Sequence, residues 1–380
     1  MSHIIKQIQT VCLDNQCIIK RNKYKNQVIS VTGTSGKTTT VKMIHDIIKS
    51  IYTVNKTYKN CNTSIGIPFC VNSYFNLNSK FWIIEIGIIK INEMIQLLNL
   101  VKPNIRVITN INEAHTDTFA SNYEYQIEKL KYLENLPPDT VLIINMDDEI
   151  LSSLNFNSNI KVIKVGCKDS NDIQLLDYQL NSDNISSTVK VRIFNDNIIK
   201  FKLNSIGFHY GIDACLAIGC AYYLNIPINI IKSSLDKFTF YKNRGSIIVK
   251  PSYTLYDYTF NCVIYACLKN LESFKNIKNN NKLIILGSKY GIKSNDIRLE
   301  QLLDSSIKIT NNIIIYSKKD FTFTLDSKYS NFNPSIKIYY NFDSILNHIK
   351  FLIKNQGHLS IFIQASNEMK LFNFTKNIKL

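Results

Sequence analysis

The sequence predicts an α/β protein in which a P-loop domain with a parallel sheet is followed by a smaller, Rossmann-like α/β domain. Three observations support this fold class. From Gln27 onward, short β-branched runs alternate with stretches of helical spacing, as in parallel strands joined by crossover helices. A second series of alternations begins after a polar stretch near residue 240. A chain of 380 residues with 45% apolar residues is also long enough to bury two cores.

The expected organisation is a short N-terminal segment (1–26), a central domain (27–240) and a C-terminal domain (241–380). Between 171 and 203 the rhythm changes to short alternating pieces, which predict a small antiparallel insertion. Helices are expected over 209–224 and 228–238. Strands are expected over 27–32, 81–86, 105–111, 141–145 and 161–165 in the central domain, and over 246–250, 254–258, 282–286, 312–316 and 360–364 in the last one.

The net charge of +16 comes from 45 Lys+Arg against 29 Asp+Glu, and all but five of the basic residues are lysines. Abundant Asn, Ile and Tyr accompany them, which is typical of a genome-wide compositional drift. We therefore expect a solvated lysine-rich surface and no nucleic-acid partner. An anion site for an acidic small molecule is the alternative interpretation.

The nine cysteines form no C-x-x-C pair, which argues against a zinc ribbon and a thioredoxin-like redox site. Buried free thiols are the expectation. No apolar stretch approaches the roughly 20 residues that cross a bilayer, and the first residues lack the order of a signal peptide. We expect a cytoplasmic protein without membrane insertion.

A phosphate-binding loop is indicated directly after the first strand, where residues 32–40 read T-G-T-S-G-K-T-T-T. Its glycines let backbone N–H groups face an anion, and the following helix start adds a positive field. Lys37 can neutralise terminal phosphates, and the Thr38 hydroxyl can hold Mg²⁺. The candidate nucleotide-binding residues here are Gly33, Thr34, Ser35, Gly36, Lys37, Thr38 and Thr39.

The strict P-loop pattern fails because Val31 occupies the position of its first glycine. The shorter form, G-T-x-G-K-T-T, resembles the Mur ligase family, whose members join a carboxylate to an amine using ATP. Residues 60–68, N-C-N-T-S-I-G-I-P, are similar to a G-N-L-N-N-x-I-G-V-P stretch in the D-Ala-D-Ala-adding branch of that family. Glu85 in E-I-G looks like the E-M-G of the same branch. A carboxylate at a strand end beside a phosphate loop is a plausible second metal ligand.

Two further segments extend the resemblance. Residues 103–115 are similar to P-x-x-x-V-I-T-N-I-x-x-A-H, which implies that Asn110 belongs to the nucleotide site and that His115 ligates Mg²⁺ or orients a phosphate. In the family a lysine on the next helix is carbamylated and bridges to metal. Lys129 lies sixteen positions before the N-M-D-D landmark at residue 145, and Lys131 is the alternative.

Residues 207–217 resemble the adenine-contacting stretch G-x-H-N-x-x-N-A-L-A-A, which adds His209, Tyr210 and Asp213 to the candidate nucleotide site. Tyr210 and Asp213 stand where the family has asparagines. A tyrosine ring can stack on a purine, and an aspartate can accept a hydrogen bond from the exocyclic amine.

In the last domain, Arg244 in N-R-G and Asp257 in D-Y-T-F-N resemble motifs whose Arg and Asp close over the phosphates and ribose of the nucleotide. Several positions depart from the family pattern, among them Cys262, which replaces a Pro. Phe260 replaces a His, and Gln364 and Asn367 replace the Lys and Arg of K-G-S-R.

The resemblance implies an ATP- and Mg²⁺-dependent ligase that forms an amide bond through an acyl phosphate. It assigns catalysis to Lys37, Glu85, His115 and Lys129, and metal binding to Thr38, Glu85, His115 and Lys129. The substrates would be a small-molecule or peptide carboxylate and an amine. A cell-wall-type peptide is the leading expectation, with a specialised metabolite or a polyglutamate-like product left open. Because 26 residues precede the first expected strand, we expect no N-terminal UDP-binding domain.

Two other functions fit parts of the sequence. A nucleotide-binding subunit that lacks ligase activity, or that depends on a partner subunit, is suggested by the altered positions Tyr210, Asp213, Phe260, Gln364 and Asn367. A P-loop ATPase acting on nucleic acid rests on the net charge alone.

Overall fold

The computed structural model describes residues 2–58, 60–113, 118–194, 197–260, 263–287, 297–317 and 336–377, with side chains described from residue 12 onward except at 297, 376 and 377. Two compact units make up the chain. The first comprises Met1–Gln179, Thr188–Leu203 and His209–Phe238, and the second comprises Leu180–Ser187, Asn204–Phe208 and Thr239–Leu380. The main passage from one unit to the other therefore follows Phe238.

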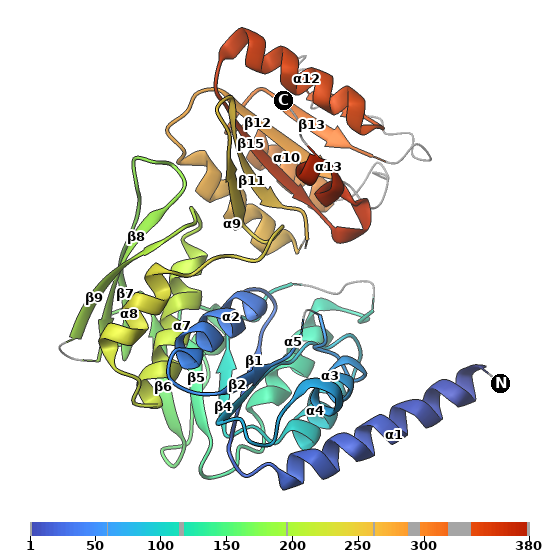
Figure 1. Ribbon diagram of the computed structural model, residues 1–380, viewed down its shortest axis with the longest axis vertical. Coiled ribbons are helices and arrows are strands. Elements are labelled where there is room, and N and C mark those ends of the chain that lie inside the picture. Colours follow the sequence, from blue (N-terminus) through green and yellow to red (C-terminus); the bar gives the residue numbers. More distant parts are fainter. Residues whose placement is uncertain are drawn as a thin grey trace. The chain divides into compact units, whose positions relative to one another are not determined.

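A nine-stranded sheet forms the centre of the first unit (Figure 1). Its strand order is β2-β3-β1-β4-β5-β6-β7-β8-β9, and every neighbouring pair from β2 to β7 is parallel. The strands are β1 (Gln27–Thr32), β2 (Val54–Lys56), β3 (Phe81–Glu85), β4 (Ile105–Ile108), β5 (Val141–Asn145), β6 (Lys161–Gly166), β7 (Ile173–Leu180), β8 (Ser187–Ile193) and β9 (Asn197–Leu203). Because β1 lies between β3 and β4, the carboxyl ends of all three meet at one edge.

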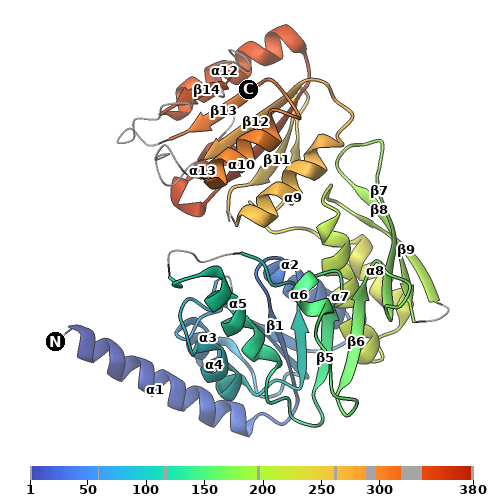
Figure 2. The same ribbon diagram turned by 180° about the vertical axis from the view of Figure 1, so that it is seen from behind.

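Helices cover both faces of this sheet, as Figures 1 and 2 show from opposite sides. Helices α2, α7 and α8 pack together on one face, and α1, α3, α4 and α5 lie on the other. The helices are α1 (Ser2–Lys23), α2 (Lys37–Lys49), α3 (Gly66–Tyr74), α4 (Glu93–Val101), α5 (Asn122–Leu130), α6 (Glu149–Ser152), α7 (His209–Tyr223) and α8 (Ile228–Asp236), with a 3₁₀ turn at Lys131–Leu133. The apolar positions of α2 that indicated a helix, Val41, Ile44, Ile47 and Ile48, are all buried.

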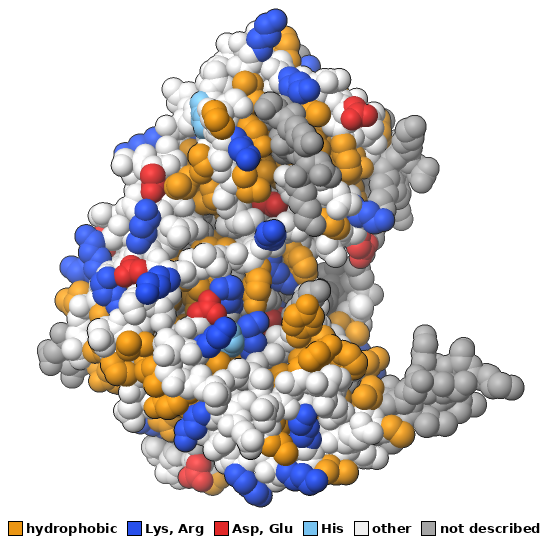
Figure 3. Space-filling view, viewed as in Figure 1, with side chains coloured by type: hydrophobic (Ala, Val, Ile, Leu, Met, Phe, Trp, Pro, Cys, Tyr) orange, Lys and Arg blue, Asp and Glu red, His pale blue; other side chains and the backbone are white. Residues whose placement is uncertain are grey.

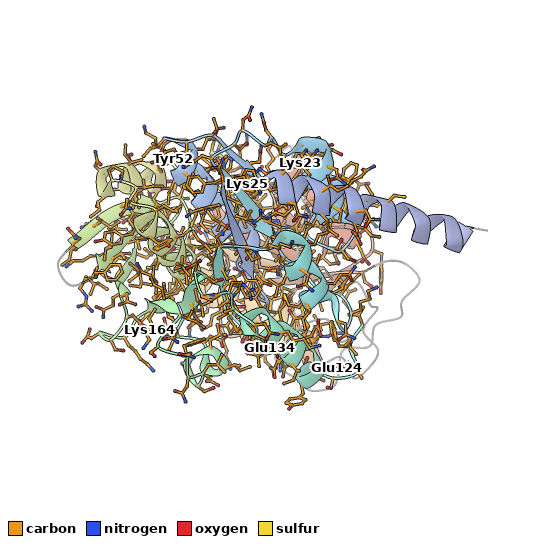
Figure 4. All side chains as sticks on the ribbon, turned by 90° about the horizontal axis from the view of Figure 1, so that it is seen from below. Lys23, Lys25, Tyr52, Glu124, Glu134 and Lys164 are labelled. Carbon is orange, nitrogen blue, oxygen red and sulfur yellow. The ribbon has the colours of Figure 1, made fainter. Side chains whose placement is uncertain are left out.

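The N-terminal segment contains a long helix, α1, whose C-terminal part packs against α3 and α4. Tyr24, just after the helix, stacks on Trp82 of β3 with ring centroids 3.8 Å apart. The Arg21 guanidinium donates to the carbonyls of Val101 and Lys102, each at 2.7 Å, and so caps the end of α4. Figure 4 shows the other end of α1 extending away from the sheet, with Lys23 and Lys25 labelled near its attachment.

The insertion expected over 171–203 extends the central sheet instead of forming a separate layer. β7 pairs in parallel with β6, and β8 and β9 follow in chain order. The turn between β7 and β8 is closed by the Asn181 amide, which donates to the Ser186 carbonyl at 2.9 Å. A connection this short joins antiparallel neighbours, so the antiparallel character belongs to the last two strands.

A six-stranded sheet with order β10-β11-β15-β12-β13-β14 forms the second unit. β10 is antiparallel to β11, and the other neighbours are parallel. The strands are β10 (Ser246–Val249), β11 (Tyr253–Tyr258), β12 (Lys282–Gly287), β13 (Ile313–Tyr316), β14 (Ile336–Tyr339) and β15 (Leu359–Ala365). The helices are α9 (Ile264–Lys275), α10 (Ile297–Ser306), α12 (Phe342–Gln356) and α13 (Leu371–Asn377), with a 3₁₀ turn at Asn367–Met369. The predicted α/β class with two sheets is confirmed.

Lysine and arginine side chains are scattered over the face shown in Figure 3, with apolar patches between them. No helix in the part of the chain that the structure describes is long and apolar enough to cross a membrane. The described cysteines are free thiols, and Cys17, Cys70, Cys215, Cys220 and Cys267 are buried, whereas Cys12 and Cys167 are exposed.

Candidate functional site

The loop between β1 and α2 has the backbone shape that its glycines predict. Gly33 has φ of 140° and Gly36, which caps α2, has φ of 78°. A Cβ atom on Gly33 would overlap Thr109 Oγ1, and one on Gly36 would overlap Asp213 Oδ1. Both positions therefore require glycine, because neighbouring chain segments press closely against the loop.

Residues after β4 hold this loop in place. The Thr34 amide donates to the Asn110 carbonyl at 2.9 Å, and the Ser35 amide donates to Asn110 Oδ1 at 3.0 Å. Thr109 Oγ1 donates to the Ser35 carbonyl at 2.6 Å. Asn110 was predicted as a nucleotide-binding residue; its side chain braces the loop itself.

These same contacts correct one boundary. The strand expected over 105–111 ends at Ile108, because Thr109 and Asn110 turn their polar groups toward the phosphate loop.

Lys37 begins α2 and folds back over the loop. Its Nζ donates to the carbonyls of Gly33 at 2.9 Å and Thr34 at 3.0 Å. Thr38 and Thr39 follow it in the first turn of the same helix. The lysine ammonium and the helix start thus lie on the loop that would cradle phosphate oxygens.

Glu85 ends β3 beside the loop, in register with Val31 of β1. It is 3% exposed, and its Oε1 accepts a hydrogen bond from Asn62 Nδ2 at 2.7 Å. Asn62 lies in the 60–68 segment that carried part of the family resemblance. The structure therefore brings two separately predicted motifs together at one carboxylate.

Lys129 of α5 reaches the carboxyl end of β1, at the same edge of the sheet as Glu85. Its side chain is 1% exposed, and its Nζ donates to Thr32 Oγ1 at 3.1 Å. Burial, and then the nearby Lys37 charge, hold the pKa of Lys129 well below its usual range, with Glu85 acting in the opposite direction. A neutral amine is the nucleophilic form of lysine, the form that carbamylation requires.

Lys131, the alternative to Lys129, has a different environment. Its Nζ donates to Glu128 Oε2 at 2.7 Å and to Asn92 Oδ1 at 3.1 Å, and its side chain is 19% exposed. It is thus held in an ion pair, whereas Lys129 lies against the strand end that carries the phosphate loop.

The three candidates on α7 lie at its start. The rings of His209 and Tyr210 are 4.0 Å apart between centroids, and Tyr210 is 6% exposed. Asp213 is 4% exposed and accepts a hydrogen bond from Thr40 Oγ1 at 3.3 Å. Burial raises the pKa of Asp213 to about 8. Its carboxyl lies beneath Gly36, at the phosphate loop.

Three of the polar side chains missed by the sequence reasoning are threonines: Thr32 receives the Lys129 hydrogen bond, Thr109 braces Ser35, and Thr40 contacts Asp213. A fourth is Tyr125, whose hydroxyl donates to Thr34 Oγ1 at 3.3 Å. Thr32 and Thr40 flank the phosphate loop in the sequence, so their position was the available signal. Nothing in the sequence alone pairs Thr40 with a residue 173 positions away.

Arg244 and Asp257 belong to the second unit. The Arg244 guanidinium lies over the Phe260 ring, 3.6 Å from its centroid. Asp257 is 1% exposed, and its Oδ1 accepts hydrogen bonds from the Thr259 amide at 3.0 Å and the Thr259 hydroxyl at 2.7 Å. Gln364 is also buried, donating to the Tyr258 carbonyl and accepting from Asn270.

The donor set at the loop suits Mg²⁺. Within the described residues no three His, Cys, Asp or Glu side chains gather as a metal cluster. The Thr38 hydroxyl and the Glu85 carboxylate are hard oxygen donors, and Mg²⁺ is commonly held by one or two protein ligands together with phosphate oxygens and water. His115, predicted as a further ligand, lies outside the described residues.

Known proteins resemble this chain in sequence. The family model of the Mur ligase middle domain matches residues 31–221. A UDP-N-acetylmuramoyl-tripeptide–D-alanyl-D-alanine ligase of Buchnera aphidicola subsp. Baizongia pistaciae is 27% identical over 372 residues, covering 97% of this chain and 78% of the relative. The enzyme of the same name from Borreliella burgdorferi is 30% identical over 298 residues, covering 76% of this chain and 60% of the relative.

Solved structures share the fold. MurF from Acinetobacter baumannii superposes with a TM-score of 0.82 at 18% identity, covering 97% of this chain and 80% of that one. MurF from Thermotoga maritima in complex with ADP superposes with a TM-score of 0.81 at 18% identity, covering 96% of this chain and 83% of that one.

Proposed function

The chain belongs to the Mur ligase family, and from this premise we propose that it joins a carboxylate to an amine in a reaction driven by ATP. One observation carries the proposal. A glycine-shaped phosphate loop, the Glu85 carboxylate and the buried amine of Lys129 meet at the carboxyl edge of β1 and β3. The reaction would take place in the cytoplasm, where ATP is available.

The loop amides and Lys37 would bind the nucleotide phosphates, with Arg244 and Asp257 contributing from the second unit. Lys37 already donates to two loop carbonyls, and it would offer the same ammonium to phosphate oxygens. Thr38 and Glu85, with His115 and a carbamylated Lys129, would hold Mg²⁺. Bound Mg²⁺ supplies charge neutralisation for the phosphate oxygens.

The chemistry has two steps. The substrate carboxylate attacks the γ-phosphorus, and ADP leaves, which produces an acyl phosphate. The amine then attacks the acyl carbon, and inorganic phosphate leaves as the amide forms. The chain's residues contribute positioning and fixed positive charge, the main sources of rate in phosphoryl transfer.

The names of the relatives suggest the substrates. We propose a cell-wall-type peptide as the carboxylate, in the form of a UDP-N-acetylmuramoyl tripeptide, and D-alanyl-D-alanine as the amine. Gln364 replaces a family lysine and forms neutral hydrogen bonds within the second unit. Because the loss of this positive charge can change which acid or amine is accepted, free peptides and glutamate are included in the same test.

The test is ADP release by the purified protein with ATP and Mg²⁺ over a matrix of these acids and amines. Release that requires one acid–amine pair is expected. Lys37→Ala is expected to lower that rate by roughly 10²–10⁴-fold, because the lysine charge stabilises the transferring phosphoryl group. Full activity of Lys37→Ala would refute the mechanism.

A second candidate is a nucleotide-binding subunit without ligase activity of its own. The observation that favours it is the changed adenine segment, in which Tyr210 and Asp213 are buried. Tight binding of ATP with no pair-dependent ADP release would support this candidate over the ligase.

A further inference from the structure

Asp213 lies buried directly beneath the nucleotide-binding loop, and the inference drawn from it rests on the proposed function. Oδ1 accepts one hydrogen bond, from the Thr40 hydroxyl, and Oδ2 is a buried oxygen without a hydrogen-bond partner. The same carboxyl fills the space that a side chain on Gly36 would need. A carboxylate in this position would carry its charge in a dry environment with a single weak donor.

Among the residues that the structure describes, no charged side chain forms a hydrogen bond or ion pair with this carboxyl. The elements packed against α7 include α2, α8, β4, β5 and β6, and also β7, whose Leu175 and Tyr178 lie against Gly211. On α7 itself, His209 stands four positions before Asp213. Charged groups of these elements have contacts with other groups. Lys37 donates to the loop carbonyls, Lys42 and His45 contact the Asp46 carboxylate, and Arg106 donates to the Tyr132 carbonyl. Lys161 lies over the Tyr223 ring, Lys232 is paired with Asp236, and Lys49 and Lys164 are exposed. Burial therefore dominates and raises the pKa of Asp213 to about 8, against the opposing effect of Thr40.

We propose that Asp213 is a positioning residue of the phosphate loop, and that its carboxyl must be protonated for the loop to hold the nucleotide's phosphates. An ionised carboxylate beneath Gly36 would place a negative charge in a low-dielectric environment next to the bound anion. A protonated carboxyl has no such charge and has the shape of an amide. The resembling family segment has asparagine at this position, which fits the same requirement.

The consequence is a proton linked to nucleotide binding. Nucleotide selects the protonated form, so above the pKa of Asp213 binding takes up one proton per molecule. The dissociation constant for ADP with Mg²⁺ should then rise with pH, by up to about tenfold per pH unit well above pH 8.

Calorimetric titration with ADP and Mg²⁺ between about pH 7.5 and pH 9.5 tests this linkage. Repeating it in two buffers of different ionisation enthalpy gives the number of protons taken up. For the wild type we expect weakening affinity and proton uptake approaching one. For Asp213→Asn we expect a flatter profile and no uptake. Equal pH profiles for the two proteins would overturn the inference and leave the proposed function standing. Failure of the wild type to bind ADP at any pH would overturn both.

Thr40→Val provides a second variant with nearly the same shape. It removes the hydrogen bond that lowers the pKa of Asp213, so the midpoint of the pH profile should move to higher pH. An unchanged midpoint would contradict the assigned contact.

Thermal unfolding without nucleotide gives an independent check. A carboxyl whose pKa is raised on folding contributes stability that is fully present below the ordinary pKa of aspartate and lost as the pH rises toward 8. The unfolding midpoint of Asp213→Asn, relative to that of the wild type, should therefore increase steadily as the pH rises from about 4 to about 8. A constant difference over this range would overturn the assignment.

Discussion

Lys129 combines three properties that are individually uncommon for lysine. Its amine is buried, its pKa is held well below the usual range, and its one described hydrogen bond is to a threonine hydroxyl, 3.1 Å away. A neutral amine can add to CO₂, forming a carbamate and releasing one proton. That reaction would convert the residue into a second carboxylate beside Glu85 and make the site a better ligand set for Mg²⁺.

Lys129→Met is expected to lower the ligase rate by at least about 10²-fold, because the site loses a carboxylate that holds metal and phosphate. The wild type, supplied with ¹³C-bicarbonate, should show a carbamate carbon resonance that is absent from the variant.

Lys131→Met is the matched control, since its amine is paired with Glu128 and Asn92. A carbamate signal that survives in Lys129→Met and disappears in Lys131→Met would reverse the assignment.

For individual residues, the sequence predicted membership of the phosphate loop better than it predicted their hydrogen-bond partners. Gly33, Gly36 and Lys37 follow from local order, because a strand, a glycine turn and a helix start are adjacent in the chain. The roles of Asn110 and Asp213 depend on segments that meet through the sheet and through α7. Their contacts with Ser35 and Thr40 join residues 75 and 173 positions apart.

Helix α1 is the element that the sequence analysis left undefined. The 26 residues before β1 looked like a short segment, yet most of them form one helix. It is attached through its C-terminal half, where Cys17 is buried in the core, Asn72 donates to the Leu13 carbonyl and Arg21 caps α4, and Tyr24 enters the core directly after the helix. A helix held at one end by tertiary packing leaves little periodic signal, because most of its length need not have a buried face.

Tyr24→Phe and Tyr24→Ala test this attachment as a pair. The phenylalanine variant keeps the ring stacked on Trp82 and loses the hydrogen bond to the Ser79 carbonyl, so we expect a cost of about 1 kcal/mol. The alanine variant removes a fully buried ring, and we expect a cost of about 3–5 kcal/mol. Urea unfolding followed by circular dichroism measures both. A cost below about 1 kcal/mol for Tyr24→Ala would mean that α1 is not part of the first core.

The parallel strands were the most predictable elements, because each is a buried β-branched run with a helix on either side. β2 and β14 were missed. Each lies at an edge of its sheet and consists of three or four residues that are mostly half-buried, so neither shows a continuous apolar run.

The molecule as a whole contains two sheets with separate hydrophobic cores, and each core lies within one unit. Cores of this size commonly unfold as separate cooperative transitions. Tyr24→Ala should identify the transition of the first unit, because Tyr24 packs in the core of that unit and the variant is expected to lower its midpoint alone.

ADP with Mg²⁺ is expected to stabilise the first unit by about 2.7 kcal/mol at a concentration of 100 times the dissociation constant. Differential scanning calorimetry measures this shift. Lys37→Ala should abolish it, because the loop that holds the phosphates lies in this unit. Because Arg244 is proposed to contact the nucleotide, the transition of the second unit should shift as well, and Arg244→Ala should remove that second shift alone. A shift in the second transition that Arg244→Ala leaves intact would count against Arg244.

The position of Trp82, stacked against Tyr24, also determines which part of the molecule tryptophan fluorescence reports on. Trp82 is the single tryptophan of the chain, and it is fully buried in the first core. Emission excited at wavelengths that tryptophan absorbs and tyrosine does not therefore reports on the first unit and not on the second. A red shift of that emission would mark the moment at which the sheet carrying the phosphate loop opens to water, without any label having been introduced.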